Sequence, residues 1–240
     1  MDYSAESAYL GNAAHIRDLF NRIAPVYDAF NQQLSFGLHR IWKQMAVDWS
    51  RAKPGDTCLD VCCGSGDLAL LLGQRVGQSG KVYGVDFAAA QLAIAQQRAN
   101  QVWPPLSYQW IEADALSLPF ADAYFDSATM GYGLRNVVDI TASLTELRRV
   151  LKPNATAAIL DFHRPASDWM QQFQQWYLST IVVPTAKQYG LASEYAYISP
   201  SLDRFLSGAE QVTTALQAGF GRAVHYPIAG GMMGVLVATR

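Results

Sequence analysis

The chain has 240 residues, half of them hydrophobic, and its formal net charge is −2. This length and composition suit one α/β domain with insertions and exclude a disordered chain. The near-neutral charge provides no basic field for a phosphate backbone, so we expect no nucleic-acid partner. No apolar run reaches the length of a membrane span, so we expect at most a peripheral contact with a membrane.

The three cysteines lie close together, at Cys58, Cys62 and Cys63. No other Cys or His has the spacing of a zinc site, so we expect buried, reduced thiols and no metal centre. The odd number of cysteines and the absence of a secretory leader indicate a reducing, cytoplasmic compartment.

Residues 1–53 are predicted to form a helical arm. A helix over about 15–24 ends at Pro25, and residues 26–42 are rich in side chains that combine an apolar body with a polar tip. Such a tract suits a packed helix with its tips in solvent and equally suits a cover over a ligand. A helix over about 41–51 then leads to a turn at residues 54–56.

The segment from Thr57 to Asp86 has the pattern of a strand, a tight turn, a helix and a second strand. Apolar residues lead into Gly64-Ser65-Gly66, leucines at helical spacing follow, and the next strand ends on Asp86. This is a βαβ unit of a doubly wound sheet, in which ligands bind beyond the carboxyl ends of the strands.

The alternation of strands and helices continues to residue 162. Strands are predicted over about 106–111, 124–130 and 155–162, and helices over 91–101 and 140–151. A turn is predicted at 152–154. Repeated alternation favours a mainly parallel sheet with right-handed crossovers.

Residues 166–207 interrupt this pattern, and we interpret them as an insertion above the strand ends. An aromatic helix is predicted over 169–181, followed by an irregular tract over 189–205. We expect the aromatic stripe to pack in the core, and its lack of lysine and arginine does not suit a basic membrane-surface helix.

The last part of the chain is predicted to contain a helix over 208–218 and two strands, over 223–228 and 231–239. Only the pair Gly230-Gly231 separates these strands, so they must be antiparallel neighbours. The predicted fold is therefore α/β, with a doubly wound, Rossmann-like sheet of seven strands that ends in an antiparallel hairpin.

The glycine turn fits a dinucleotide-binding fingerprint, because Asp86 lies twenty residues beyond Gly66. That signal is weak alone, and Asp60, four residues before Gly64, is the discriminating residue. A fixed carboxylate there opposes a pyrophosphate and suits a cationic ligand. S-adenosylmethionine carries a sulfonium and an ammonium group and has no phosphate.

If the ligand is S-adenosylmethionine, each acidic residue has a binding role, and each also has a purely structural alternative. Asp86 would hold the ribose, and Asp114 would accept from the adenine amino group beside backbone contacts from Ala115. Each could instead be a cap or turn residue, and Asp67 is expected to be an ordinary helix-start residue. Their joint placement after successive strands favours the cofactor site.

These motifs resemble those of class I S-adenosylmethionine-dependent methyltransferases. Residues 27–42, 133–137 and 149–153 are similar to the ubiquinone and menaquinone biosynthesis C-methyltransferases, and the resemblance covers about residues 15–240. The short form and the Cys-Cys-Gly-Ser-Gly-Asp turn resemble the demethylphylloquinone methyltransferases of cyanobacteria and plastids. The expected cofactor-binding residues are Asp60, Gly64, Ser65, Gly66, Asp86, Phe87, Asp114, Ala115 and Gly131.

The resemblance implies C-methylation of a prenylated quinol, with 2-phytyl-1,4-naphthoquinol as the best single substrate. Demethylmenaquinol and a polyprenyl benzoquinol are the alternative acceptors. An NAD(P)-dependent oxidoreductase and a lipid-quinone carrier without catalysis are the alternatives from other functional classes. A homodimer is compatible with each of these.

The reduced ring becomes a better nucleophile when a hydroxyl proton is lost, so groups that stabilise the resulting oxyanion would assist. Arg135, beside Asn136, is the first candidate. Tyr27, Asp28 and His39 follow, with His39 as a proton acceptor. His39 equally suits a helix-start histidine held by its neighbours. The other histidines are expected to be structural.

Overall fold

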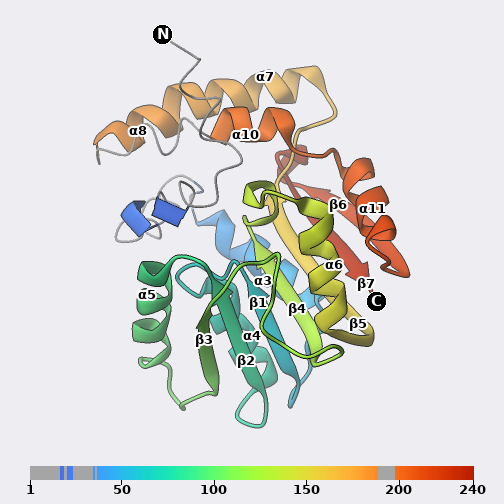
Figure 1. Cartoon of the computed structure of the whole chain (residues 1–240). Helices are drawn as coiled ribbons and strands as arrows, with labels where there is room; N and C mark the ends of the chain where they lie inside the picture. Colours follow the sequence, from blue (N-terminus) through green and yellow to red (C-terminus); the bar gives the residue numbers. More distant parts are fainter. Residues whose placement is uncertain (1–16, 19–20, 24–34, 36, 189–197) are drawn as a thin grey trace.

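A computed structural model shows a seven-stranded sheet with helices on both faces (Figure 1). The structure describes residues 17–18, 21–23, 35, 37–188 and 198–240. The strands are β1 (Thr57–Val61), β2 (Lys81–Asp86), β3 (Tyr108–Glu112), β4 (Phe125–Gly131), β5 (Leu151–Phe162), β6 (Arg222–Ile228) and β7 (Met233–Thr239). The main α-helices are α3 (Leu38–Trp49), α4 (Asp67–Val76), α5 (Ala89–Ala99), α6 (Ile140–Val150), α7 (Asp168–Tyr177), α8 (Val183–Gln188), α10 (Ile198–Arg204) and α11 (Gly208–Gln217).

The strands are ordered β3-β2-β1-β4-β5-β7-β6 in the sheet. β1 to β5 are parallel, and β7 is antiparallel to both β5 and β6. The doubly wound sheet with a C-terminal antiparallel hairpin is therefore confirmed. β1 lies near the middle, where the strand order reverses between β2 and β4, so a crevice is expected at its carboxyl end.

Two apolar clusters fix the helices on the sheet. On α4, Leu68, Leu72 and Val76 recur at helical spacing and are buried, and Val47 of α3 joins the same cluster. On the other face, α6 and α11 cover the strands, and Leu147 of α6 belongs to the second cluster. Burial of one stripe on each helix is the main source of this arrangement's stability.

The fifth strand begins earlier than predicted. Leu151 is buried and pairs with Phe125 of β4, whereas the next pairing joins Thr156 to Ser127. The residues expected to form a turn instead form a bulge within β5, and Asn154 adopts a left-handed φ of 65° in it. The burial of Leu151 explains why the strand extends through Pro153.

The tract 189–205 is not irregular throughout, because α10 occupies its second part. Residues 189–197 lie outside the described residues. Ile198 and Leu202 are four residues apart and buried, which gives α10 an apolar side. Pro200 is tolerated because it lies in the first turn, where the missing N–H has no helical acceptor.

The aromatic stripe of α7 does not pack in the core as expected, because Trp169, Phe173 and Trp176 are exposed. α7 continues through a π-helical turn, η3 (Leu178–Val182), into α8. Figure 1 shows α7, α8 and α10 as a layer above the carboxyl ends of the strands. We call residues 166–188 and 198–207 the helical cover. Among the described residues, no helix is both long and apolar enough to cross a membrane.

Candidate cofactor site

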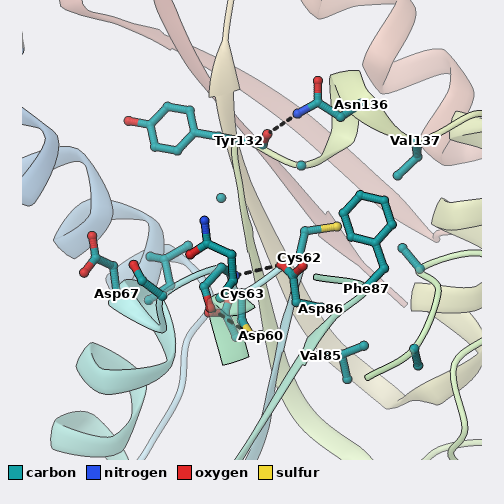
Figure 2. Close-up of a pocket in the computed structure, with 18 of the residues that line it drawn as sticks. Asp60, Cys62, Cys63, Asp67, Val85, Asp86, Phe87, Tyr132, Asn136 and Val137 are labelled. Carbon is teal, nitrogen blue, oxygen red and sulfur yellow. Dashed lines mark hydrogen bonds between the residues drawn. The ribbon is translucent and has the colours of Figure 1, made fainter. Parts of the chain in front are cut away.

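A pocket lies where β1, β2, β3 and β4 end, with α3 at its edge (Figure 2). The expected residues that line it are Asp60, Gly64, Ser65, Asp86, Phe87, Asp114, Ala115, Gly131 and Asn136. The sequence analysis did not expect several other lining residues, among them Lys43, Cys62, Gln91 and Tyr132. The strand ends are brought together by the parallel sheet, as predicted. Lys43 directly follows the tract 27–42, and no local pattern marks it as a ligand-binding residue.

The glycine turn has the backbone that its sequence requires. Gly64 has a φ of +52° and Gly66 a φ of +87°, both in the left-handed region. A Cβ on Gly66 would lie 2.9 Å from the Trp110 ring and 3.0 Å from the Ala95 Cβ atom. Gly66 lies behind the pocket wall, where it permits close packing of the turn against β3 and α5.

The Gly64 and Gly66 amides of this turn and the Ala69 amide of α4 donate within the protein. The Gly64 amide donates to an Asp86 carboxylate oxygen at 2.8 Å, and the Ala69 amide donates to Asp60 at 2.9 Å. The Gly66 amide donates to the Cys63 carbonyl oxygen at 2.9 Å. A dinucleotide site uses such amides to bind a pyrophosphate. Here the carboxylates of Asp60 and Asp86 accept two of these hydrogen bonds in place of a pyrophosphate, which favours a ligand without phosphate.

Burial places Asp60 and Asp86 in an environment that penalises their negative charge. It raises the pKa of Asp60 to about 7, although the Thr129 hydroxyl donates to this carboxylate at 2.8 Å. Burial likewise raises the pKa of Asp86 to about 6, although the Ala88 amide donates to it at 2.9 Å. A cation in the pocket would favour the ionised form of both groups.

Asp114 lies at the more open end of the pocket, where β3 has ended. Its side chain is exposed and accepts from the Leu116 amide at 2.9 Å. This contact makes it a turn residue, which was its ordinary alternative. Its position in the lining also leaves it available to a ligand.

Lys43 joins α3 to the first residue of α4. Its ammonium group forms an ion pair with Asp67, and Arg98 of α5 bonds to the same carboxylate at 2.5 Å. Burial raises the pKa of Asp67, but the charges of Lys43 and Arg98 outweigh it and hold the pKa at about 2. Asp67 is therefore more than a helix-start residue. It fixes a lysine at the pocket, where the Lys43 ammonium lies 5.8 Å from the Tyr132 ring centroid.

Two non-glycine residues at the pocket adopt left-handed backbone angles, Cys62 with a φ of 53° and Tyr132 with a φ of 59°. A Cβ on Gly133 would lie 2.6 Å from the Cys62 Cβ atom, so the segments after β1 and β4 pack very closely. Strain of this kind is often found at binding sites. Figure 2 shows the side-chain amide of Asn136 donating to the Tyr132 carbonyl oxygen, at 3.0 Å.

The three cysteines are free thiols. Cys58 and Cys63 are buried, as expected, and burial raises the pKa of Cys58 to about 12. Cys62 and Cys63 both line the pocket, and Cys62 differs because it is only half-buried. Burial raises its pKa well above the usual value, so it acts there as an uncharged wall residue.

Arg135, the first catalytic candidate, forms a buried ion pair and does not line the pocket. It lies in η2 (Leu134–Asn136), and its guanidinium forms an ion pair with Asp161 of β5. The two side chains are only 6% and 4% exposed, and Arg135 also lies 4.9 Å from the Phe162 ring centroid. Arg135 is absent from the pocket lining, whereas Asn136 belongs to it. The geometry suits a residue that positions the wall.

His39 is also held away from the pocket lining. It is buried on α3, and its Nδ1 atom lies 2.6 Å from the Ser35 hydroxyl, which fits the alternative of a histidine held by neighbours. The other two candidates, Tyr27 and Asp28, lie outside the described residues. His163 bonds through Nδ1 to the Gly231 carbonyl oxygen at 2.9 Å, which fits a structural histidine.

Comparison with known proteins identifies the family. The sequence profile of the ubiE/COQ5 methyltransferase family matches residues 9–240. The chain belongs to this family. A 2-phytyl-1,4-naphtoquinone methyltransferase from Trichormus variabilis is 65% identical over 225 residues, which are 94% of this chain and 98% of that protein. A chloroplastic 2-phytyl-1,4-beta-naphthoquinone methyltransferase from Arabidopsis thaliana is 53% identical, covering 93% of this chain and 87% of that protein.

Solved structures agree with this assignment at the level of the fold. A SAM-dependent methyltransferase from Aquifex aeolicus superposes with a TM-score of 0.59 at 22% identity, covering 82% of this chain and 88% of that one. Another from Thermotoga maritima has a TM-score of 0.65 at 19% identity, covering 92% and 98%. The protein is a methyltransferase of the ubiE/COQ5 family, as the sequence motifs predicted.

Proposed function

We propose that the protein methylates a ring carbon of 2-phytyl-1,4-naphthoquinol, with S-adenosylmethionine as the methyl donor. One observation carries the choice of cofactor: the Gly64 amide of the turn donates to Asp86 and the Ala69 amide of α4 donates to Asp60, and these carboxylates oppose a pyrophosphate and favour a cation. The choice of acceptor is supported by the relatives, which share 53% to 65% identity over most of the chain.

The lining residues divide into two groups that suit the two ends of this cofactor. Asp86, Phe87, Asp114 and Ala115 follow β2 and β3, and would take the ribose and adenine. Lys43 and Asp60 lie on the other side of the glycine turn, among the residues that would take the amino-acid end. The Lys43 ammonium would bind the carboxylate of that end, while Asp60 favours positive charge.

When bound, the cofactor would supply an electrophilic methyl group on sulfonium to the ring carbon, with sulfur keeping the electron pair and the ring losing a proton. The chain's part is to orient the reactants in a pocket that excludes water. Tyr132, Asn136 and Val137, after β4, would form the wall towards the acceptor. Arg135 would hold that wall in place through Asp161.

The direct test is to incubate the protein with labelled S-adenosylmethionine and a panel of reduced, demethylated naphthoquinols and benzoquinols. We expect carbon methylation, fastest with 2-phytyl-1,4-naphthoquinol. Preference for demethylmenaquinol or a benzoquinol would overturn the choice of acceptor.

Isothermal titration should detect binding of S-adenosylmethionine and no binding of NADH, and the reverse result would indicate an oxidoreductase. Quinone binding without cofactor binding would indicate a carrier.

Two variants assign the activity to the pocket. Asp86→Asn keeps the size of the side chain but removes a carboxylate that lines the pocket, so cofactor affinity should fall by roughly tenfold or more. Glu112→Gln is the matched control, because Glu112 ends β3 with an exposed side chain outside the lining. Equal affinities for the two variants would contradict the proposed site.

A further inference from the structure

Three aromatic side chains of α7 face solvent along one side of the helix. Trp169, Phe173 and Trp176 are 66%, 41% and 51% exposed, and they recur at the i, i+4 and i+7 spacing of one helical face. We call them the aromatic stripe. Single exposed apolar residues are ordinary, but three large aromatic ones on one face of a helix need an explanation.

The opposite side of the same helix is fixed to the body of the protein. Gln174 is 7% exposed, and its amide nitrogen donates to the carbonyl oxygens of His163 at 3.0 Å and Met232 at 3.3 Å. Leu178, at the start of η3, is also buried. These contacts hold α7 against the ends of β5 and β7, so the aromatic stripe is presented outward by a fixed helix.

The stretch of sequence that carries the aromatic stripe has few charged residues. From residue 169 to residue 186 the sequence contains no Asp, Glu, Lys or Arg, and the flanking charges are Asp168 and Lys187. The other exposed residues of α7 are Asp168, Gln172 and Gln175. Arg164 and Asp203 line a small pocket with the glutamines of α7, one charge of each sign. The stripe is therefore an aromatic surface without a cluster of basic residues.

The aromatic stripe belongs to the same end of the molecule as the cofactor site. α7 lies in the helical cover above the carboxyl ends of the strands (Figure 1). α10 of the same cover contacts η2, the turn that carries Asn136 of the pocket wall. A surface held by the aromatic stripe would thus lie at the end of the molecule that holds the pocket.

We propose that the aromatic stripe docks on the surface of a lipid bilayer whose headgroups carry no net charge. The inference rests on the proposed function in one respect, since a phytyl quinol is dissolved in lipid and must be collected there. Tryptophan places an apolar ring and an N–H donor at the boundary between headgroups and acyl chains. Without basic residues, the stripe gains nothing from anionic lipids, so a neutral bilayer is the matching partner.

The test is sedimentation of the full chain with phosphatidylcholine vesicles. The wild-type protein should sediment with them, and salt or the addition of about one-third phosphatidylserine should change its binding little. The variant W169S/F173S/W176S should bind at least about tenfold more weakly, because three buried rings are lost. Trp103→Ser is the matched control, because Trp103 is 86% exposed. It precedes β3, the edge strand on the side of the sheet away from β5 and β7. Its loss should leave vesicle binding unchanged.

Several outcomes would overturn the docking surface. The first is equal binding of the triple variant and the wild type to the vesicles. The second is binding to vesicles that requires phosphatidylserine and is lost in high salt. A third is a dimer in sedimentation velocity that only the triple variant disrupts, which would make the stripe an interface between copies of this chain. Unchanged thermal unfolding must accompany the loss of binding in the triple variant.

A separate measurement distinguishes failure of this inference from failure of the proposed function. Methylation of a short-tailed naphthoquinol dissolved in buffer should be the same for the triple variant and the wild type, while turnover of the phytyl quinol in vesicles falls. If the wild type methylates no quinol, the proposed function fails whatever the vesicles show. If short-tailed turnover is normal and vesicle binding is absent, only the docking inference fails.

Discussion

Gly66 and Gly64 lie in the same turn but differ in their surroundings. A Cβ on Gly66 would meet Trp110 at 2.9 Å, whereas the nearest atom to one on Gly64 is a Gln91 oxygen at 3.9 Å. Gly64→Ala should cost about 1–2 kcal/mol, the penalty of a left-handed backbone. Gly66→Ala adds overpacking of about 1–3 kcal/mol. Urea unfolding of both variants measures the difference, and equal losses would contradict the packing described.

Lys43 allows a more selective test of the cofactor's orientation. Lys43→Met should weaken S-adenosylhomocysteine binding by roughly 10- to 100-fold, the worth of a hydrogen bond to a charged group. Binding of methylthioadenosine, which lacks the amino-acid end, should change little. The turn should survive, because Asp67 keeps Arg98.

Calorimetric titration of both ligands measures the two affinities. Lys53→Met is the control, because Lys53 is exposed and lies outside the pocket lining. A similar loss of affinity for both ligands would place Lys43 away from the amino-acid end and would contradict the proposed role.

At the scale of elements, one buried ion pair joins η2 to β5. Arg135→Ala leaves the Asp161 carboxylate buried without its cation, so it should lower the free energy of unfolding by about 3–5 kcal/mol. Adding Asp161→Ala should recover part of this loss, because no unpaired charge then remains. Chemical denaturation of the two single variants and the double variant gives the coupling energy.

The surface pair Arg75–Asp48 is the control for that cycle. Its side chains are 40% and 47% exposed, so Arg75→Ala should cost no more than about 1 kcal/mol. If Arg135→Ala is equally mild but abolishes turnover, Arg135 acts on the substrate directly, as the sequence alone had suggested.

At the scale of the whole molecule, the buried carboxylates couple cofactor binding to pH. Burial raises the pKa of Asp60 from 3.8 to about 7 and that of Asp86 from 3.8 to about 6. The fold therefore favours their protonated forms, and this contribution to stability is lost as pH rises through those values. A cationic ligand restores it, because it favours the ionised carboxylates.

S-adenosylmethionine should therefore stabilise the protein more at about pH 8 than at about pH 5.5. Affinity should rise by up to about tenfold per pH unit for each carboxylate that titrates. Thermal unfolding with and without ligand across this range provides the measurement. S-adenosylhomocysteine lacks the sulfonium and should show a weaker dependence, so parallel profiles for the two ligands would contradict the electrostatic account.

Most of the fold and half of the site follow from local patterns. Strand ends in a parallel sheet meet at one edge, so Asp60, Asp86 and Asp114 could be brought together from sequence alone. Lys43 could not, because the approach of α3 to α4 depends on tertiary packing. Nor could the pairing of Arg135 with Asp161, since nothing in the pattern of either segment specifies the other.

The helical cover shows what helical periodicity in a sequence cannot predict. The spacing of Trp169, Phe173 and Trp176 correctly predicted one helical face, but it could not show whether that face meets the core or solvent. α10 was missed because it has seven residues and an early Pro200, too short for its period to appear.

The strand order has a consequence for how the protein folds. β7 lies between β5 and β6, and β6 has no other partner in the described sheet. β6 and β7 are neighbours in sequence and can pair locally, but the hairpin joins the main sheet only through β7. Its docking waits for contacts between β5 and β7, which are distant in sequence. Amide protons of β7 that bond to β5 should accordingly be protected after those of β1 and β4.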